Sequence, residues 1–211
     1  MNNVSFEEFK ECLNYGFDRK GLDNILQEVK VLTPIPVPCD ILTQQVICGI
    51  GKLRAKYNEK NLSKSHNNDW DDKTSLETHI EGAFGEYCYE VLSGTPMDKS
   101  IGRRNPYDFK HGNIEVDVKC SERGKYLYVK KKRLINHDHD DYWYALLKGD
   151  PKKYTGEFVG CITGKEFSNI CKPYPENPES LSVRSDQLRP MSELYDRLKK
   201  GGHLNGQGVW K

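Results

Sequence analysis

The pattern of apolar and polar positions changes near residue 94. Before it, residues 75–93 place apolar side chains at helical spacing, and Gly94 is a natural stop. The apolar positions of this stretch are Leu76, Ile80, Ala83, Phe84, Tyr87, Val91 and Leu92. The spacing predicts a helix over 75–93.

After residue 94 the pattern is typical of strands, with short alternating runs between turn residues. The predicted strands cover 106–110, 113–121, 126–129, 142–148 and 157–163, the first two forming a hairpin around the HGN tripeptide at 111–113. A short helix at 164–171, a short strand at 182–184 and a helix at 191–200 complete the chain. This order predicts an α/β (α+β) core in which helices flank one central mixed β-sheet.

The first third of the chain has a different pattern. Residues 5–30 and 41–60 are predicted to be helical, and the three alternate prolines of 33–39 predict an extended connector between them. Residues 61–73 are polar and predict a loop. We therefore expect a helical N-terminal segment over 1–65 and a core domain over 66–211.

Composition narrows the class of protein. The 211 residues contain 32 Lys and Arg against 31 Asp and Glu, so the net charge is only +1. No run approaches the roughly 20 apolar residues of a membrane span, and the acidic N-terminus is unlike a signal peptide. The seven cysteines include no C-x-x-C pair, which indicates reduced thiols. We expect a soluble cytoplasmic protein without a membrane partner.

One segment is strongly basic. Residues 123–133, RGKYLYVKKKR, combine Tyr126 and Tyr128 with six cations: Arg123, Lys125, Lys130, Lys131, Lys132 and Arg133. One interpretation is a solvated edge strand whose lysines prevent aggregation. The other is a strand that contacts the phosphates of DNA, since a nearly neutral protein needs a local patch to hold nucleic acid.

The segment IEVDVK at 114–119 carries the candidate chemistry. Asp117 and Lys119 share one strand face, and Asp108 lies on the preceding predicted strand. Two carboxylates on adjacent strands can converge on one point, and oxygen ligands suit Mg²⁺, to which the carbonyl of Val118 would add another. Such a site supports attack of water on a phosphodiester. The alternative is a turn aspartate beside a solvent-facing strand.

These residues resemble a known signature. Pro106-Tyr107-Asp108, followed after eight residues by Asp117-Val118-Lys119, is similar to the motif of the PD-(D/E)XK nucleases. Tyr107 departs from the strict Pro-Asp dipeptide, and Asp117 replaces the commoner Glu. The segment GAFGE within the predicted helix 75–93 ends in Glu86, about 20 residues before Asp108, which resembles the exonuclease and resolvase branches found in phages and bacteria. The resemblance covers roughly residues 75–200.

The resemblance implies a restriction-endonuclease-like fold and a mechanism. Glu86, Asp108, Asp117 and the Val118 carbonyl would hold Mg²⁺, with Mn²⁺ as a substitute. Lys119 would position the attacking water, and the products would carry 5′-phosphate and 3′-hydroxyl ends. Glu81 is a rival to Glu86, because five residues turn a helix by about 500° and both cannot face one ion.

Other residues near this motif have simpler interpretations. The His- and Asp-rich stretch 137–141 suggests either a metal site or, as we prefer, a hydrated loop. Cys120 is expected on the opposite strand face from Lys119, in the core. Glu115 is expected at the rim of the site, paired with a lysine.

The leading hypothesis is a Mg²⁺-dependent deoxyribonuclease, an endonuclease of phage or bacterial origin. The alternative is a non-catalytic module that binds nucleic acid or protein and retains the nuclease fold, and a third hypothesis is a nuclease acting on RNA. Endonucleolytic or exonucleolytic attack, and a monomer or a homodimer, all remain open at this stage.

Overall fold

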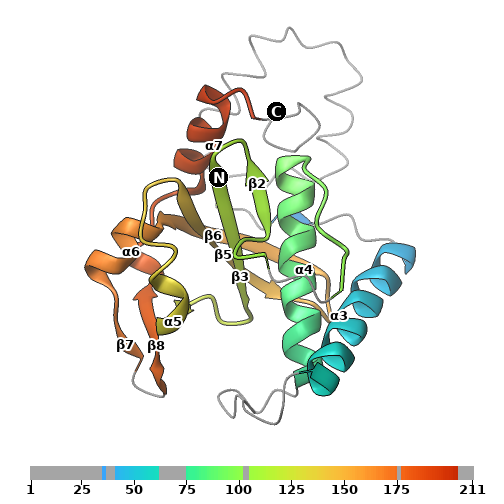
Figure 1. Cartoon of the computed structure of the whole chain (residues 1–211). Helices are drawn as coiled ribbons and strands as arrows, with labels where there is room; N and C mark the ends of the chain where they lie inside the picture. The colour runs from blue at the N-terminus through green and yellow to red at the C-terminus, as the bar shows by residue number, and fades with distance from the viewer. Residues whose placement is uncertain (1–34, 37–40, 62–74, 102–104, 175–176, 204–211) are drawn as a thin grey trace, which may run out of the picture. The chain divides into compact units, whose positions relative to one another are not determined.

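The computed structural model describes residues 35–36, 41–61, 75–101, 105–174 and 177–203 (Figure 1). The predicted helix at 5–30, most of the predicted connector and the predicted domain boundary at residue 65 lie outside this part of the chain. The described part is a mixed α+β structure, as the order of patterns predicts.

The main sheet has five strands in the order β1-β6-β5-β3-β2. Their bounds are β1 Ile35–Pro36, β2 Phe109–His111, β3 Ile114–Ser121, β5 Tyr142–Asp150 and β6 Thr155–Thr163. β3 runs parallel to β5 and the other pairs are antiparallel, so the sheet is mixed as predicted. The predicted hairpin around HGN is confirmed, with Gly112 in the left-handed conformation at φ 62° that its turn requires.

Two helices cover one face of this sheet. α3 (Ile41–Asn61) packs beside α4 (Ser75–Ser93), and α4 lies across β3 (Figure 1). Gly51 allows the close approach of the helices, because a Cβ there would lie 2.7 Å from a carbon of Ile80. Both helices were predicted from the sequence, α4 from its apolar spacing, and α4 has the predicted bounds. Phe84, Tyr89, Val116 and Trp143 are among the buried side chains between helices and sheet.

A second sheet covers the opposite face, where the sequence predicts a single sheet. It has the order β4-β8-β7, with β4 Tyr126–Lys130, β7 Lys172–Tyr174 and β8 Asn177–Arg184. The prediction of one sheet is wrong because β4 does not pair with β3 but with β8. Leu127 and Val129 thereby pack onto Tyr144 of the main sheet, closing a second buried cluster.

The predicted basic strand is also corrected. β4 ends at Lys130, and Lys131–Leu134 form the one-turn helix α5. The reason is that Lys131, Lys132 and Arg133 include no apolar side chain to alternate onto a sheet face, and a helical turn leaves all three exposed.

The C-terminal elements complete the core. α6 (Gly164–Ile170) begins at a capping box between Thr163 and Glu166, and a 3-10 turn follows at Ser185–Gln187. α7 (Met191–Lys200) buries Leu194 and Leu198 in the same cluster as α4. Among the described helices, none is both long and apolar enough to cross a lipid bilayer.

Candidate acidic site

The site forms where the edge strand β2 begins. The backbone N–H of Asp108, which directly precedes β2, donates to the carbonyl of Val116 in β3 (3.0 Å). One step further along β3, the N–H of Val118 donates to Asp108 Oδ2 at 2.7 Å. The Asp108 side chain therefore replaces a missing backbone partner, and this bond fixes the carboxylate at the sheet edge.

Asp117 and Lys119 form a tight pair on the neighbouring strand. Lys119 Nζ donates to Asp117 Oδ1 at 2.6 Å, and the Asp117 side chain is only 3% exposed. The second oxygen, Asp117 Oδ2, is buried and has no hydrogen-bond partner within the described structure. A buried oxygen left in this way costs about 1–3 kcal/mol. The site thus contains a carboxylate oxygen that the protein itself does not satisfy.

The two aspartates are electrostatic neighbours, as predicted. Burial raises the pKa of Asp108 well above its usual value, and the negative charges of Asp117 and Glu86 raise it further. Lys119 opposes this shift by favouring the charged form. Three carboxyl groups therefore influence one another here, with Lys119 beside Asp117 and Arg54 beside Glu86 as the neighbouring cations.

Glu86 is held by a residue that sequence reasoning missed. Arg54 of α3 donates to both of its oxygens, at 2.5 and 2.9 Å, and also to the backbone carbonyl of Asp98 at 3.0 Å. Its guanidinium also lies near enough to Asp108 for that charge to raise the pKa of Arg54. Arg54 stands 32 residues before Glu86, in a helix with several exposed cations, and no local pattern singles it out.

Glu86 and Asp117 lie on opposite faces of the main sheet. Glu86 lies on α4, the helix that packs against Val118 and Cys120, whereas Asp117 pairs in register with Tyr144 on the opposite face. Asp108, at the edge of the sheet, interacts electrostatically with both Glu86 and Asp117. The structure therefore brings Asp108, Asp117 and Lys119 together, and it holds Glu86 nearby in an ion pair with Arg54. Within the described residues, no three His, Cys, Asp or Glu side chains are grouped so as to hold a metal ion.

The flanking predictions are largely confirmed. Glu115 pairs with Lys110 at 2.9 Å. Cys120 faces α4, because a Cβ added to Gly85 of that helix would lie 2.9 Å from the Cβ of Cys120. The hydrated-loop prediction holds for residues 138–140, which are exposed, but it is wrong for His137. That imidazole is 3% exposed, stacks on Tyr142 at 3.9 Å and bonds the hydroxyl of Tyr144 at 2.9 Å.

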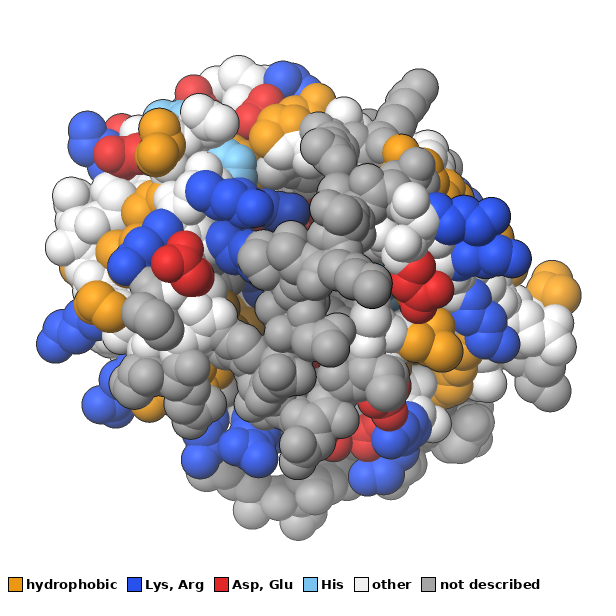
Figure 2. All heavy atoms as spheres, turned by 60° about the horizontal axis from the view of Figure 1, so that its bottom comes forward, with side chains coloured by type: hydrophobic (Ala, Val, Ile, Leu, Met, Phe, Trp, Pro, Cys, Tyr) orange, Lys and Arg blue, Asp and Glu red, His pale blue; other side chains and the backbone are white. Residues whose placement is uncertain are grey.

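Basic side chains of the chain lie in separate groups. Burial lowers the pKa of Lys130, and the nearby charges of Lys132, Arg133 and Lys119 lower it further, so these three cations lie within electrostatic reach of Lys130. Arg123 and Lys125 are exposed at the start of the same segment. Figure 2 shows Lys and Arg side chains in several groups with acidic side chains between them, not in one continuous patch.

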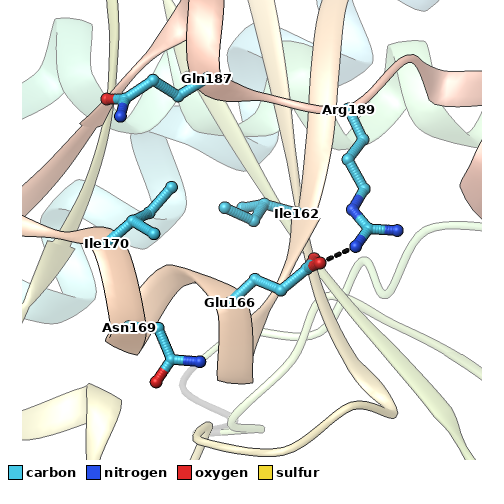
Figure 3. Close-up of a pocket in the computed structure, with 6 residues that line it drawn as sticks. All are labelled: Ile162, Glu166, Asn169, Ile170, Gln187 and Arg189. Carbon is cyan, nitrogen blue, oxygen red and sulfur yellow. Dashed lines mark ion pairs between the residues drawn. The ribbon is translucent and has the colours of Figure 1, made fainter.

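A pocket elsewhere contains none of the predicted site residues. This hollow of about 190 Å³ is lined by Ile162, Glu166, Asn169, Ile170, Gln187 and Arg189 (Figure 3). Arg189 forms ion pairs with Glu166 and, at 2.6 Å, with Glu193. Its charged groups therefore satisfy one another, which is the behaviour of a structural contact between α6 and the segment after β8.

Comparisons with protein-family models, with curated proteins and with solved structures find no match.

Proposed function

We propose that this chain is a metal-dependent DNA nuclease of the PD-(D/E)XK type, which hydrolyses phosphodiester bonds and acts as an endonuclease. The observation that carries the proposal is the buried pair Asp108 and Asp117, with Lys119 on one oxygen of Asp117 and no partner for the other among the described residues. A protein that needs only stability gains nothing from two adjacent buried carboxylates.

The donor set fits a hard divalent cation. Mg²⁺ prefers oxygen ligands, and Asp108, Asp117 and the Val118 carbonyl would hold it, with Mn²⁺ as a substitute. The Val118 carbonyl suits this role because the N–H and C=O of one residue point to the same side of a strand. Its N–H meets Asp108, so its carbonyl faces the same edge. A bound ion would supply Lewis-acid stabilisation of the phosphate and a more acidic water.

Glu86 would join the site by exchanging partners. Both of its oxygens accept hydrogen bonds from Arg54, so a cation would compete with this guanidinium for them. An incoming cation would compensate Glu86, and Arg54 would then be free to bind a phosphate, for which its planar donors are suited. We therefore propose that Arg54 is the counter-ion of Glu86 in the metal-free protein.

Lys119 would act on the reacting groups. Its ammonium is fixed by Asp117 Oδ1 and is about one quarter exposed, so it can also reach solvent. In this position it would orient the attacking water and stabilise negative charge that develops on the phosphate oxygens. Its role requires the amine, and arginine would not reproduce the same compact donor.

The alternative proposal is a non-catalytic module that binds nucleic acid or protein. The observation favouring it is the Arg54–Glu86 pair, because a guanidinium fixed permanently in this place would make a metal unnecessary. The two proposals differ in one respect that can be measured, since the module would bind its ligand without Mg²⁺ or Mn²⁺.

Cleavage of a panel of substrates tests the proposal. Supercoiled plasmid, linear duplex, single-stranded DNA and RNA are incubated with Mg²⁺, Mn²⁺ or EDTA, using the wild type, Lys119→Ala and the control Lys110→Ala. Lys110 is an exposed lysine of the same hairpin, paired with Glu115. We expect metal-dependent cutting that Lys119→Ala abolishes and Lys110→Ala retains, with the circular plasmid opened if attack is endonucleolytic. Equal cutting by both variants would contradict the proposal.

A further inference from the structure

The outer face of the second sheet carries three tyrosines in mutual contact. Tyr126 and Tyr128 come from β4 and Tyr174 from β7, and all three are half-buried. Their ring centroids are 6.0 Å (126–128), 5.8 Å (126–174) and 4.6 Å (128–174) apart. Because β8 lies between β4 and β7, the rings of Tyr128 and Tyr174 meet across the central strand.

The sequence of β8 makes this arrangement possible. Ser182 is in register with Tyr128 and Ser180 with Lys130, and both serines are buried, at 7% and 6% exposure. Small side chains on the central strand leave room for the rings from either side to close over them. The alternate residues Leu127, Val129 and Val183 point the other way into the core, so the tyrosines occupy the solvent side of the sheet.

Cations accompany the rings on the same face. Lys130 follows Tyr128 by two residues, and Lys172 precedes Tyr174 by two and is in register with Ser182. Arg184, in register with Tyr126, is exposed and paired with Asp186. Burial lowers the pKa of Lys130, and the positive charges of Lys132, Arg133 and, least, Lys119 lower it further, so Lys130 lies within electrostatic reach of the lysine that pairs with Asp117.

We propose that this tyrosine face binds single-stranded DNA, with bases stacked on the rings and phosphates on Lys130 and Lys172, and that it leads the strand to the acidic pair. Every base has a π-face, so an aromatic surface with cations beside it holds a single strand largely irrespective of sequence. Duplex DNA does not fit this surface, because its bases are stacked on one another and are not exposed to the rings. The delivery of the strand rests on the proposed nuclease function, whereas the binding does not.

The test is binding of a fluorescein-labelled oligothymidylate, followed by fluorescence anisotropy in EDTA so that no cleavage occurs. The full chain is compared with Tyr128→Phe, Tyr128→Leu and Tyr174→Leu, and with Tyr195→Leu as a control on α7. Loss of one stacked base weakens binding by about tenfold. We expect that loss for Tyr128→Leu and Tyr174→Leu, and wild-type affinity for Tyr128→Phe and Tyr195→Leu. Circular dichroism establishes that each variant is folded.

Two outcomes would overturn the inference: equal affinity of Tyr128→Leu and Tyr128→Phe, or tighter binding of duplex than of single strand by the wild type. The outcome for the nuclease is separate. Metal-dependent cutting of single-stranded DNA that Tyr128→Leu leaves unchanged would support the nuclease and refute the delivery of the strand by the tyrosine face. Ring-dependent binding by a protein that cuts nothing with either metal would support the tyrosine face and refute the nuclease.

Discussion

At the scale of single residues, the site is a concentration of unfavourable charge. Asp108 and Asp117 lie close to each other, and burial together with the charge of Asp117 raises the pKa of Asp108. The Oδ2 atom of Asp117 lacks a hydrogen bond in the described structure. Groups that destabilise a fold yet remain in place are typical of functional sites. Removing the charge should therefore stabilise the metal-free protein while it abolishes cleavage.

The variant Asp108→Asn tests whether the buried charge of Asp108 lowers the free energy of unfolding as pH rises. An amide oxygen can still accept the Val118 N–H, but the charge is gone. The pKa of Asp108 is raised in the fold, so the wild type loses stability as pH rises from the ordinary value of 3.8 through the folded value. In EDTA we expect Asp108→Asn to be more stable at pH 7 by about 1–2 kcal/mol, with the advantage vanishing below pH of about 4.

Urea denaturation across this pH range measures the difference, with Asp140→Asn at an exposed position as the control. A variant that is less stable than the wild type at pH 7, or a difference independent of pH, would refute the account of Asp108.

Arg54→Ala tests whether Glu86 can accept a metal. Without the guanidinium, a carboxylate that is 10% exposed loses its partner, and removal of one member of a buried pair costs up to about 3–5 kcal/mol. The partial exposure of Arg54, at 21%, places the expected loss near or below the lower end. Mg²⁺ should restore part of it, because the cation replaces the lost charge.

Thermal melting with and without Mg²⁺ provides the readout, and Lys52→Ala on the exposed side of α3 is the matched control. We expect a larger Mg²⁺-dependent rise in Tm for Arg54→Ala than for the wild type or Lys52→Ala. The same rise in all three proteins would mean that Glu86 does not bind the ion.

Sequence reasoning finds some of these residues and not others. Asp108, Asp117 and Lys119 can be placed together because a tight hairpin fixes their register, and alternation fixes the shared face of the last two. Arg54 cannot be found in this way, since its contact with Glu86 depends on how two helices pack. The burial of His137 beneath Tyr142 likewise depends on a loop whose polar composition predicts the opposite.

At the scale of elements, strong periodicity gives the helices and most strands, but it does not assign strands to sheets. β4 alternates apolar and polar residues equally well for a partner in either sheet, and its pairing with β8 is decided by the core that Leu127 and Val129 complete. The turn from β4 into α5 is similarly invisible, because three consecutive cations favour exposure without specifying a strand or a helix.

Alanine substitutions at two glycines of α4 distinguish the effect of helix propensity on stability from the effect of packing. A Cβ on Gly85 would lie 2.9 Å from the Cβ of Cys120, whereas a Cβ on Gly82 would have no atom within 4 Å. We expect Gly82→Ala to stabilise the protein by about 1 kcal/mol, because alanine is the better helix former. Gly85→Ala should destabilise it by about 1–3 kcal/mol through overpacking of α4 on β3.

Chemical denaturation of the two variants provides the comparison. Gly85→Ala should also reduce cleavage, since Glu86 follows directly on the displaced helix. Stabilisation of both variants to the same extent would mean that α4 does not press against β3 at Gly85.

At the scale of the whole molecule, charge must act locally. The net charge of +1 provides no general attraction to nucleic acid, so binding depends on groups such as the exposed lysines of α5. Each phosphate contact contributes to the dependence of affinity on salt. The double variant Lys131→Ala/Lys132→Ala should therefore weaken DNA binding and reduce the salt slope by about 1.4–1.8 if both lysines contact phosphates.

Anisotropy titrations over a range of salt concentrations measure this slope, and Lys152→Ala/Lys153→Ala provides an exposed control pair in another loop. An unchanged slope in the α5 variant would exclude these lysines from the interface.

Metal binding is the most direct test of the central claim, because it does not require the substrate to be known. Isothermal titration calorimetry with Mn²⁺ compares the wild type, Asp117→Asn and Glu115→Gln, the last being a carboxylate two residues away on the same strand face that pairs with Lys110. The account predicts a Mn²⁺ site in the wild type that Asp117→Asn loses and Glu115→Gln retains. Absence of a site in the wild type, or its persistence in Asp117→Asn, would contradict it.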